Sequence, residues 1–272
     1  MQDNPKALKA LTDEAEKLKS RGTWDLTSVR EWYEVAKEAK QKGNKVHVGR
    51  IFPIVVEKNA ELPEGHPDRK FKGRIVFGGD QVTDEHNATA IFQELATSPA
   101  SLEASKILDA YSLLPGNKGE QNDGTQAFTQ AELGNVHSNV LTWARLPKEL
   151  QPKTFEKYRD PVVIVRKALY GHPEAQGHWE QHLEKILLKT LGYEKFENWP
   201  SLYWHAKTKI LLLVFVDDFK IAGPAAAIRP AWEALSKHVE MSGSKPIEKF
   251  LGCFHRWGTD TIDGKTVRTV QY

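Results

Sequence analysis

The sequence predicts an α+β fold, and two observations carry that prediction. Segments whose apolar residues recur at helical spacing are interspersed with short segments of strand character. One apolar segment, residues 203–221, turns back on itself at two consecutive Asp residues, which is typical of an antiparallel hairpin. Helices that interrupt such a hairpin, without a regular strand–helix repeat, favour α+β. With 272 residues, 40% of them hydrophobic, the chain is long enough for one large or two modest domains.

The N-terminal part is predicted to hold two helices and two strands. Residues 4–20 are rich in Ala, Leu, Lys and Glu at helical spacing, and a second helical stretch covers 28–42. Residues 45–58 and 71–77 have the apolar and β-branched content of strands. A polar segment with Pro and Gly at 62–67 is expected to form the loop between these strands.

The elements of the second half are predicted in the same way. Residues 115–122 show neither the helical nor the strand period and are expected to form a loop. The stretch 173–191 is strongly amphipathic and carries Pro173 near its first turn, which favours a helix. The other expected elements are helices at 99–114 and 225–238 and strands at 162–165, 250–257 and 266–271.

Composition excludes several classes of protein. A net charge of +2 is only weakly basic, so nucleic-acid binding would depend on local patches. Cys253 is the only cysteine, which excludes a disulfide framework and is typical of a reducing compartment. The chain shows no apolar signal core and no apolar run of membrane-spanning length. We therefore expect a soluble, intracellular protein.

Two adjacent carboxylates, Asp217 and Asp218, are the strongest candidates for chemistry. The preceding strand, residues 210–216, is apolar on both faces and is expected to lie inside a sheet. Carboxylates at the edge of such a core repel each other and lose hydration, and a divalent cation would relieve both costs. The alternative is an ordinary two-residue hairpin loop, because Asp tolerates the backbone angles that such a loop needs. A third carboxylate would favour the metal site, and Asp123 is the candidate.

Three cations alternate along one predicted strand. Lys70, Lys72 and Arg74 would share one face, whereas Phe71 and Ile75 would take the other. A face of this kind suits the phosphates of a nucleotide. It is equally typical of a solvated strand edge that Lys residues guard, so spacing alone leaves both interpretations open.

Several short motifs occur in a fixed order. They are Thr23-Trp24-Asp25-Leu26, Lys72-Gly73-Arg74-Ile75-Val76, Asp123 with Phe128, Leu169-Tyr170-Gly171, Phe215-Val216-Asp217-Asp218 and Phe250-Leu251-Gly252. In this order, and with Trp179 eight residues after Gly171, they resemble the polymerase domain of copia-type retrotransposons, a branch of the reverse transcriptases. The resemblance spans roughly residues 5–256.

The resemblance implies an RNA-directed DNA polymerase with a hand-like fold of fingers and palm. Asp123, Asp217 and Asp218 would be the catalytic residues and the ligands of two Mg²⁺ ions, with Mn²⁺ as the alternative metal. Two such ions, roughly 3.5–4 Å apart, stabilise the attacking and leaving oxygens when a primer 3′-hydroxyl attacks the α-phosphorus of a dNTP.

Substrate-binding residues also follow from the resemblance. Lys72 and Arg74 would bind the triphosphate, and Gly171 would lie near the incoming nucleotide and the template. Leu251 and Gly252 fall where reverse transcriptases hold the primer end.

Phe128 would select the sugar. In the family, an aromatic ring at this place packs under the deoxyribose and would clash with a 2′-hydroxyl, the group that distinguishes a ribonucleotide. The alternative is a core Phe beside a turn.

The resemblance also predicts an organisation and partners. Residues 1–98 would form N-terminal helices and fingers, 99–256 the palm, and 257–272 the start of a truncated extension, with thumb and RNase H largely missing. The expected partners are an RNA or DNA template with its primer, dNTPs, and other parts of a Gag-Pol polyprotein such as integrase and RNase H, without a membrane. The expected location is the cytoplasm, including virus-like particles, or the nucleus.

The chain departs from the family's usual sequence in two places. His172-Pro173-Glu174 stands where Leu-Lys-Gln is common, and the polar residues 116–122 with Gly124 would loosen Asp123. These departures favour a second hypothesis, a truncated or decayed, catalytically inactive remnant that keeps the fold and still binds nucleic acid. A third hypothesis, an unrelated metal-dependent nuclease, explains the carboxylates but not the order of the other motifs.

Overall fold

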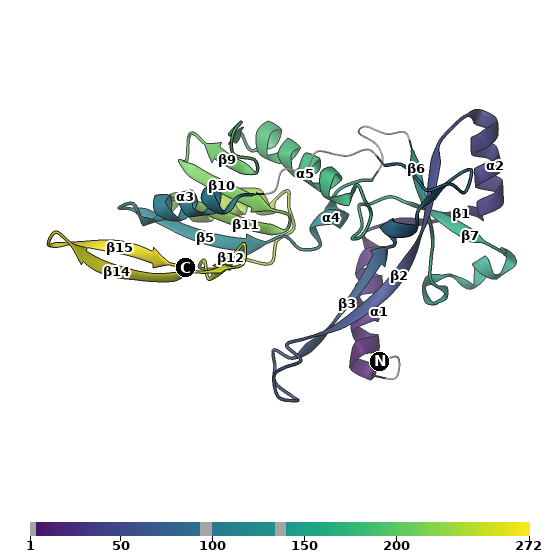
Figure 1. Ribbon diagram of the computed structural model, residues 1–272, viewed down its shortest axis with the longest axis horizontal. Coiled ribbons are helices and arrows are strands. Elements are labelled where there is room, and N and C mark those ends of the chain that lie inside the picture. The colour runs from purple at the N-terminus through teal and green to yellow at the C-terminus, as the bar shows by residue number, and fades with distance from the viewer. Residues whose placement is uncertain (1–3, 93–99, 134–139) are drawn as a thin grey trace. The chain divides into compact units, whose positions relative to one another are not determined.

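Two units make up the chain, and each has its own sheet. The computed structural model describes residues 4–92, 100–133 and 140–272 (Figure 1). The first unit comprises residues 1–95 and 131–178, and the second comprises 96–130 and 179–272. Helices and largely antiparallel sheets occur in both, which confirms a mixed α and β fold. The division into fingers at 1–98 and palm at 99–256 stays a prediction. No described helix is long and apolar enough to cross a membrane.

The first unit is built on a sheet of order β1-β7-β6-β2-β3, with β4 paired to β2. Among the described strands of this sheet, only β2 and β6 run parallel. Its strands are β1 (Trp24–Glu31), β2 (Val46–Lys58), β3 (Lys70–Phe77), β4 (Thr83–Asp84), β6 (Leu141–Arg145) and β7 (Pro161–Val165). Its helices are α1 (Pro5–Ser20) and α2 (Trp32–Lys42), with short 3₁₀ turns at Gly79–Gln81, Lys148–Leu150 and Lys153–Lys157.

Helix α1 begins and packs for local reasons. The Asn4 side chain accepts hydrogen bonds from the Lys6 and Ala7 amides, and Pro5 occupies the first helical position. The helix lies so close to β3 that a Cβ on Gly73 would meet the Ala10 carbonyl oxygen at 2.4 Å. This contact covers one face of β3 and leaves the other face for its cations.

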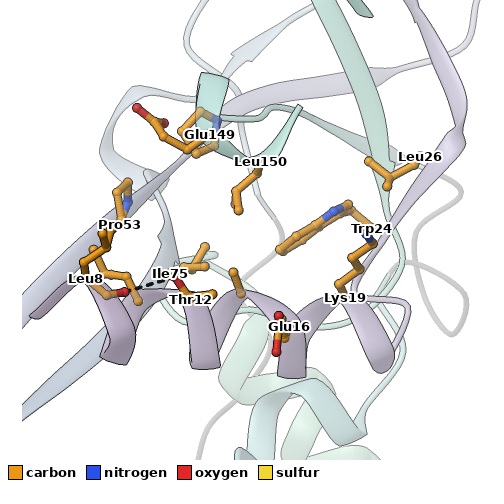
Figure 2. A pocket seen from close by; sticks show the side chains of 13 residues that line it. Leu8, Thr12, Glu16, Lys19, Trp24, Leu26, Pro53, Ile75, Glu149 and Leu150 are labelled. Carbon is orange, nitrogen blue, oxygen red and sulfur yellow. Dashed lines mark hydrogen bonds between the residues drawn. The ribbon is translucent and has the colours of Figure 1, made fainter. Parts of the chain in front are cut away.

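An apolar pocket of about 310 Å³ lies beside α1 (Figure 2). Leu8 on the helix, Trp24 at the start of β1 and Leu150 from a neighbouring turn contribute to its wall. Trp24 itself is 6% exposed. The Trp of the Thr-Trp-x-Leu motif therefore serves the packing of the first unit.

The second helix starts later than its sequence period indicates. Residues 24–31 form β1 instead of the start of a helix at 28, because they pair with β7, for example Trp24 with Val165. The Ser28 hydroxyl also accepts a hydrogen bond from the Ile164 amide at 2.9 Å. The prediction of a helix over 28–42 was therefore wrong for its first turn, since a distant strand supplies the competing hydrogen bonds.

The second unit is built on a sheet of order β5-β11-β10-β9-β8. Its strands are β5 (Asn117–Asp123), β8 (Glu194–Lys195), β9 (Leu202–His205), β10 (Ile210–Phe215) and β11 (Asp218–Pro224), followed by the two-stranded pairs β12 (Lys249–Phe250) with β13 (Cys253–Phe254) and β14 (Arg256–Ile262) with β15 (Lys265–Gln271). Its helices are α3 (Leu102–Leu113), α4 (Ala127–Gln130), α6 (Ala225–Ser236) and α5 (Ala175–Lys185), which begins in the first unit and continues as a π-helical turn, Ile186–Thr190.

One part of the core of the second unit lies between α3 and one face of this sheet. Leu108 on the helix, Leu211 and Leu213 on β10 and Phe250 on β12 belong to one buried cluster. The helices expected at 173–191 and 225–238 and the hairpin at 203–221 are confirmed as α5, α6 and β9 to β11. The loop expected at 115–122 is a correction, because most of it is strand β5.

Strand β5 forms because both of its edges find backbone partners. On one side it pairs with β11 over seven residue pairs. On the other side, Gln121 exchanges two backbone hydrogen bonds of 2.9 Å with Lys245, and the Thr125 amide donates to the Glu240 carbonyl at 2.8 Å. We call residues 240–248 the edge segment. This segment supplies hydrogen-bond partners to the polar strand β5. Periodicity rules could not identify the strand, because hydrogen bonds and not apolar burial stabilise it.

The edge segment also supplies hydrogen-bond donors to the side chains of β5. Asn122 Oδ1 accepts from the Gly243 amide at 2.9 Å, and Gln121 Oε1 accepts from the Glu248 amide at 3.1 Å. Both side chains belong to residues that are at least nine-tenths buried. Strand β5 is therefore an anchored support for Asp123, not a loose approach to it.

Candidate active site

The three predicted carboxylates meet at one end of the second sheet. Asp123 is the last residue of β5 and Asp218 is the first of β11, and the two are direct register partners across the ladder. Asp217 lies in the turn that precedes β11. Side chains of cross-strand partners share one face, so Asp123 and Asp218 lie side by side on the α3 face of the sheet.

The turn at these carboxylates is shifted by one residue from the prediction. Phe215 pairs with Asp218, so the two-residue loop is Val216-Asp217 and not Asp217-Asp218. Val216 has a φ of 56°, a left-handed conformation that a β-branched residue rarely adopts. Such strain, of order 1–3 kcal/mol, persists only where the surroundings hold it.

Two hydrogen bonds hold the strained turn. Trp179 Nε1 donates to the Val216 carbonyl at 2.7 Å, and the Gly124 amide donates to the Asp217 carbonyl at 2.6 Å. Trp179 is fully buried on α5, and its hydrogen bond fixes the turn. Gly124 does not loosen Asp123 as the sequence indicated, because its amide ties the end of β5 to the turn.

The surroundings of Asp218 shift the pKa of its carboxyl. Burial raises the pKa of its carboxyl to about 6, and the neighbouring charges of Asp217 and Asp123 and a hydrogen bond with Asp123 act in the same direction. Lys245 opposes these effects. Burial and the neighbouring carboxylates thus both disfavour the ionised form of Asp218, and a bound cation would offset both effects.

Lys245 is a functional-site residue that sequence reasoning missed. Its Nζ lies 3.0 Å from Asp123 Oδ2, and the two side chains are 45% and 41% exposed. No local motif signals this pair, because Lys245 reaches Asp123 only through the pairing of the edge segment with β5.

The oxygen donors fit a hard cation such as Mg²⁺ in their chemistry. Across the described residues, however, no three or more His, Cys, Asp or Glu side chains are arranged so that they could already hold a metal ion. Asp123 is engaged by Lys245 instead.

Phe128 follows Asp123 on the short helix α4 and is half-buried, whereas its neighbours Ala127 and Thr129 are buried. The helix is held in place by Gln130, whose Nε2 donates to the Thr125 carbonyl at 2.9 Å and whose Oε1 accepts from the Glu240 amide at 2.9 Å. Phe128 is thus not a fully buried core residue. Its role toward the sugar stays a prediction.

The predicted triphosphate ligands lie in the first unit. Lys72 is exposed and Arg74 half-exposed on β3, opposite the buried Gly73 and Ile75, as the alternation predicts. The Arg74 guanidinium lies 4.9 Å from the centroid of the Tyr170 ring, within range of a cation–π contact. Binding of phosphate by these side chains stays a prediction.

Gly171 is required by the fold itself. Its φ is 87°, and a Cβ would lie 2.1 Å from the Phe77 carbonyl oxygen. The Phe77 amide also donates to the Tyr170 carbonyl at 2.8 Å. The backbone that approaches Gly171 is that of β3, and contact with a nucleotide or template stays a prediction.

Leu251 and Gly252, the predicted primer-positioning residues, form the turn between β12 and β13. Both have a positive φ, 48° for Leu251 and 80° for Gly252. Positive values at both positions are those of a type I′ hairpin turn, and they are strained for Leu.

Comparisons with known proteins agree with the motif order. A family model described as "Reverse transcriptase (RNA-dependent DNA polymerase)" matches residues 54–265, a range that contains every predicted site residue. The Truncated transposon Ty1-A Gag-Pol polyprotein of Saccharomyces cerevisiae is 26% identical over 98 residues, 35% of this chain and 8% of that protein. The Transposon Ty1-DR5 Gag-Pol polyprotein of the same yeast is 26% identical over 98 residues, 35% of this chain and 5% of that protein.

The matched segment therefore covers less than a tenth of the length of these relatives. Among solved structures, a telomerase from Candida albicans in complex with a fragment of telomeric RNA is similar with a TM-score of 0.43 and 9% identity. That similarity covers 86% of this chain and 45% of the telomerase chain.

Proposed function

Because this chain belongs to the reverse transcriptase (RNA-dependent DNA polymerase) family, we propose that it extends a primer 3′-hydroxyl with dNTPs on an RNA template, as the polymerase part of a copia-type Gag-Pol polyprotein. The observation that carries the proposal is the register of β5 and β11. It sets Asp123 beside Asp218, with Asp217 in the adjoining turn.

Asp123, Asp217 and Asp218 would hold the divalent ions. When bound, Mg²⁺ neutralises charge on the attacking and leaving oxygens of the phosphoryl transfer. The protein's own contribution is position: the β5–β11 ladder fixes two carboxylates, and Trp179 and Gly124 fix the turn that carries the third. Crowded charge at Asp218 supports this assignment, since a cation would relieve it.

Substrate contacts complete the proposal. Lys72 and Arg74 would bind the triphosphate from one face of β3, and Phe128 would contact the sugar. Leu251 and Gly252 would position the primer end. Residues 1–98 would then supply the fingers and residues 99–256 the palm.

A second candidate function is an inactive remnant that binds nucleic acid. Its main support in the sequence, a loop before Asp123, does not hold, because β5 is a strand anchored on both edges. The contact of Lys245 with Asp123 is the one observation that favours the remnant, since this ammonium occupies a carboxylate that a metal ion would need.

Primer extension on an RNA template with Mg²⁺ and dNTPs tests the proposal. Wild type is compared with Asp217→Asn and with Asp263→Asn, which removes the same charge from the distant turn of the β14–β15 hairpin. We expect wild type and Asp263→Asn to extend the primer and Asp217→Asn not to do so. A folded wild type that binds primer–template without extending it would establish the remnant, and shortening of the primer would establish a nuclease.

A further inference from the structure

The hairpin of β12 and β13 carries strain at its tip. Leu251 is held in the left-handed region with a φ of 48°. A bulky residue keeps such a conformation only where its surroundings fix both legs of the turn. The hairpin is only two residue pairs long, so its own ladder cannot supply that restraint.

Both legs are anchored to one buried polar group. On the first leg, Phe250 is 3% exposed, and the Lys220 ammonium lies 5.2 Å from its ring centroid. Directly after the second leg, His255 donates its backbone amide to the Glu248 carbonyl at 2.9 Å, which closes the base of the hairpin. The ring of His255 then reaches Asp109, with 3.0 Å between Nε2 and Oδ2.

Asp109 on α3 is the centre of this group. Its Oδ1 lies 2.6 Å from Lys220 Nζ, and both side chains are 0% exposed. The Tyr272 hydroxyl donates to Oδ2 at 2.9 Å. Lys220 also donates to Ser105 Oγ at 2.9 Å, one turn earlier on the same helix. A buried carboxylate therefore joins β11, the residue after β13 and the residue after β15.

Lys220 connects this group to the carboxylates of the site. It lies two residues after Asp218 on β11, so the two side chains share the α3 face about 7 Å apart along the strand. Strand β11 is flanked by β5 and β10 and cannot shift without breaking both ladders. A single rigid strand thus carries both a metal-site carboxylate and the anchor of the hairpin.

We propose that Lys220 and Asp109 are positioning residues that clamp the 249–254 hairpin to the strand of Asp218, and so set where the primer end lies relative to the carboxylates. The inference rests on the proposed function for its purpose, whereas the clamp itself rests on the contacts alone. A Lys inside an apolar strand gives no hint of this role in the sequence, because its partners come from two distant segments, α3 and β12.

Hydrogen exchange of the full chain tests the clamp without metal or nucleic acid. The variants are Lys220→Met and, because that change leaves the buried Asp109 carboxylate without its ammonium partner, the double variant Lys220→Met with Asp109→Asn. Ile221→Val is the control, since it perturbs the neighbouring buried position of β11 without touching the group. We expect the His255 amide and the β12–β13 amides to exchange at least about tenfold faster in the clamp variants, with β10 unchanged. Unchanged hairpin exchange, or an equal rise across the whole second unit, would overturn the clamp.

Primer extension tests the positioning role. We expect kcat to fall about 10–100-fold in the double variant, because a misplaced primer end reacts slowly, while the KM for dNTP changes less than about twofold. An unchanged kcat in a variant whose hairpin exchanges faster would overturn the role. A wild type that extends no primer would overturn the proposed function and this role with it, and the exchange result would still decide whether the clamp exists.

Discussion

The Lys245 ammonium lies 3.0 Å from Asp123 Oδ2, so a carboxylate of the site is held by a cation of the protein itself. The contact arises because the backbone of Lys245 is bonded to Gln121, two residues before Asp123. A metal ion that takes Asp123 as a ligand competes with this ammonium. Both side chains are nearly half exposed, which makes the pair weak and easy to displace.

Removing this ammonium should strengthen metal binding. Exposed ion pairs contribute about 0.2–1 kcal/mol, so Lys245→Met should raise the affinity for Mg²⁺ by about 1.5–5-fold. Calorimetric titration of the folded chain with Mg²⁺ measures this directly. Lys237→Met removes one exposed positive charge from the end of α6 and should leave the affinity nearly unchanged. Weaker Mg²⁺ binding in Lys245→Met would mean that Lys245 supports the metal site instead of competing with it.

Relieving the strain at Val216 should stabilise the second unit. Gly adopts a φ of 56° without steric cost, so Val216→Gly should gain about 1 kcal/mol after the extra backbone entropy of Gly is counted. The comparison is Val214→Gly, a buried position of β10 where the same change removes packing and should destabilise. Urea denaturation of both variants measures the difference. Equal destabilisation would show that packing of the Val216 side chain outweighs its strain.

Acid should destabilise the first unit through His172. Burial lowers the pKa of this imidazole to about 3 from its ordinary 6.5, so the folded state stays neutral where the unfolded state gains a proton. Stability is complete above pH 6.5 and falls as the pH drops below it, by about 2 kcal/mol at pH 5. Burial lowers the pKa of His47 as well, which adds to the same trend.

Urea denaturation at pH 7.5 and pH 5 measures this loss. His172→Gln should reduce the difference between the two pH values, and His238→Gln, at an exposed position, should leave it unchanged. An unaltered difference in His172→Gln would assign the acid sensitivity to other groups.

Loss of the Phe128 ring should admit ribonucleotides. If the ring blocks a 2′-hydroxyl, Phe128→Ala should raise the kcat/KM for a ribonucleotide relative to its deoxy counterpart by about tenfold or more. Phe196→Ala, at an exposed aromatic position away from α4, is the control. Single-nucleotide extension with matched dNTP and rNTP gives the ratio. An unchanged ratio between ribonucleotide and deoxyribonucleotide would indicate that Phe128 serves only the packing of α4.

Much of the secondary structure and the family could be predicted from the sequence, because the patterns that indicate them are local. The amphipathic periods of α5 and α6 and the apolar runs of β10 and β11 reflect burial of one or both faces, and the motif order identifies the family. Asp217 and Asp218 were candidates because two carboxylates follow a buried strand, and the motif order supported Asp123 as the third. The β5–β11 register then showed that Asp123 and Asp218 lie side by side.

Tertiary structure alone decided the remaining features, for one physical reason. Strand β5, the shortened start of α2, the Lys245–Asp123 pair and the Lys220–Asp109 clamp all depend on hydrogen bonds or charges supplied by distant segments. Periodicity records whether a residue is buried by apolar contact, but it does not record which polar partner meets it. The sequence by itself therefore determined the family and the candidate carboxylates, whereas strand pairing determined what surrounds and positions them.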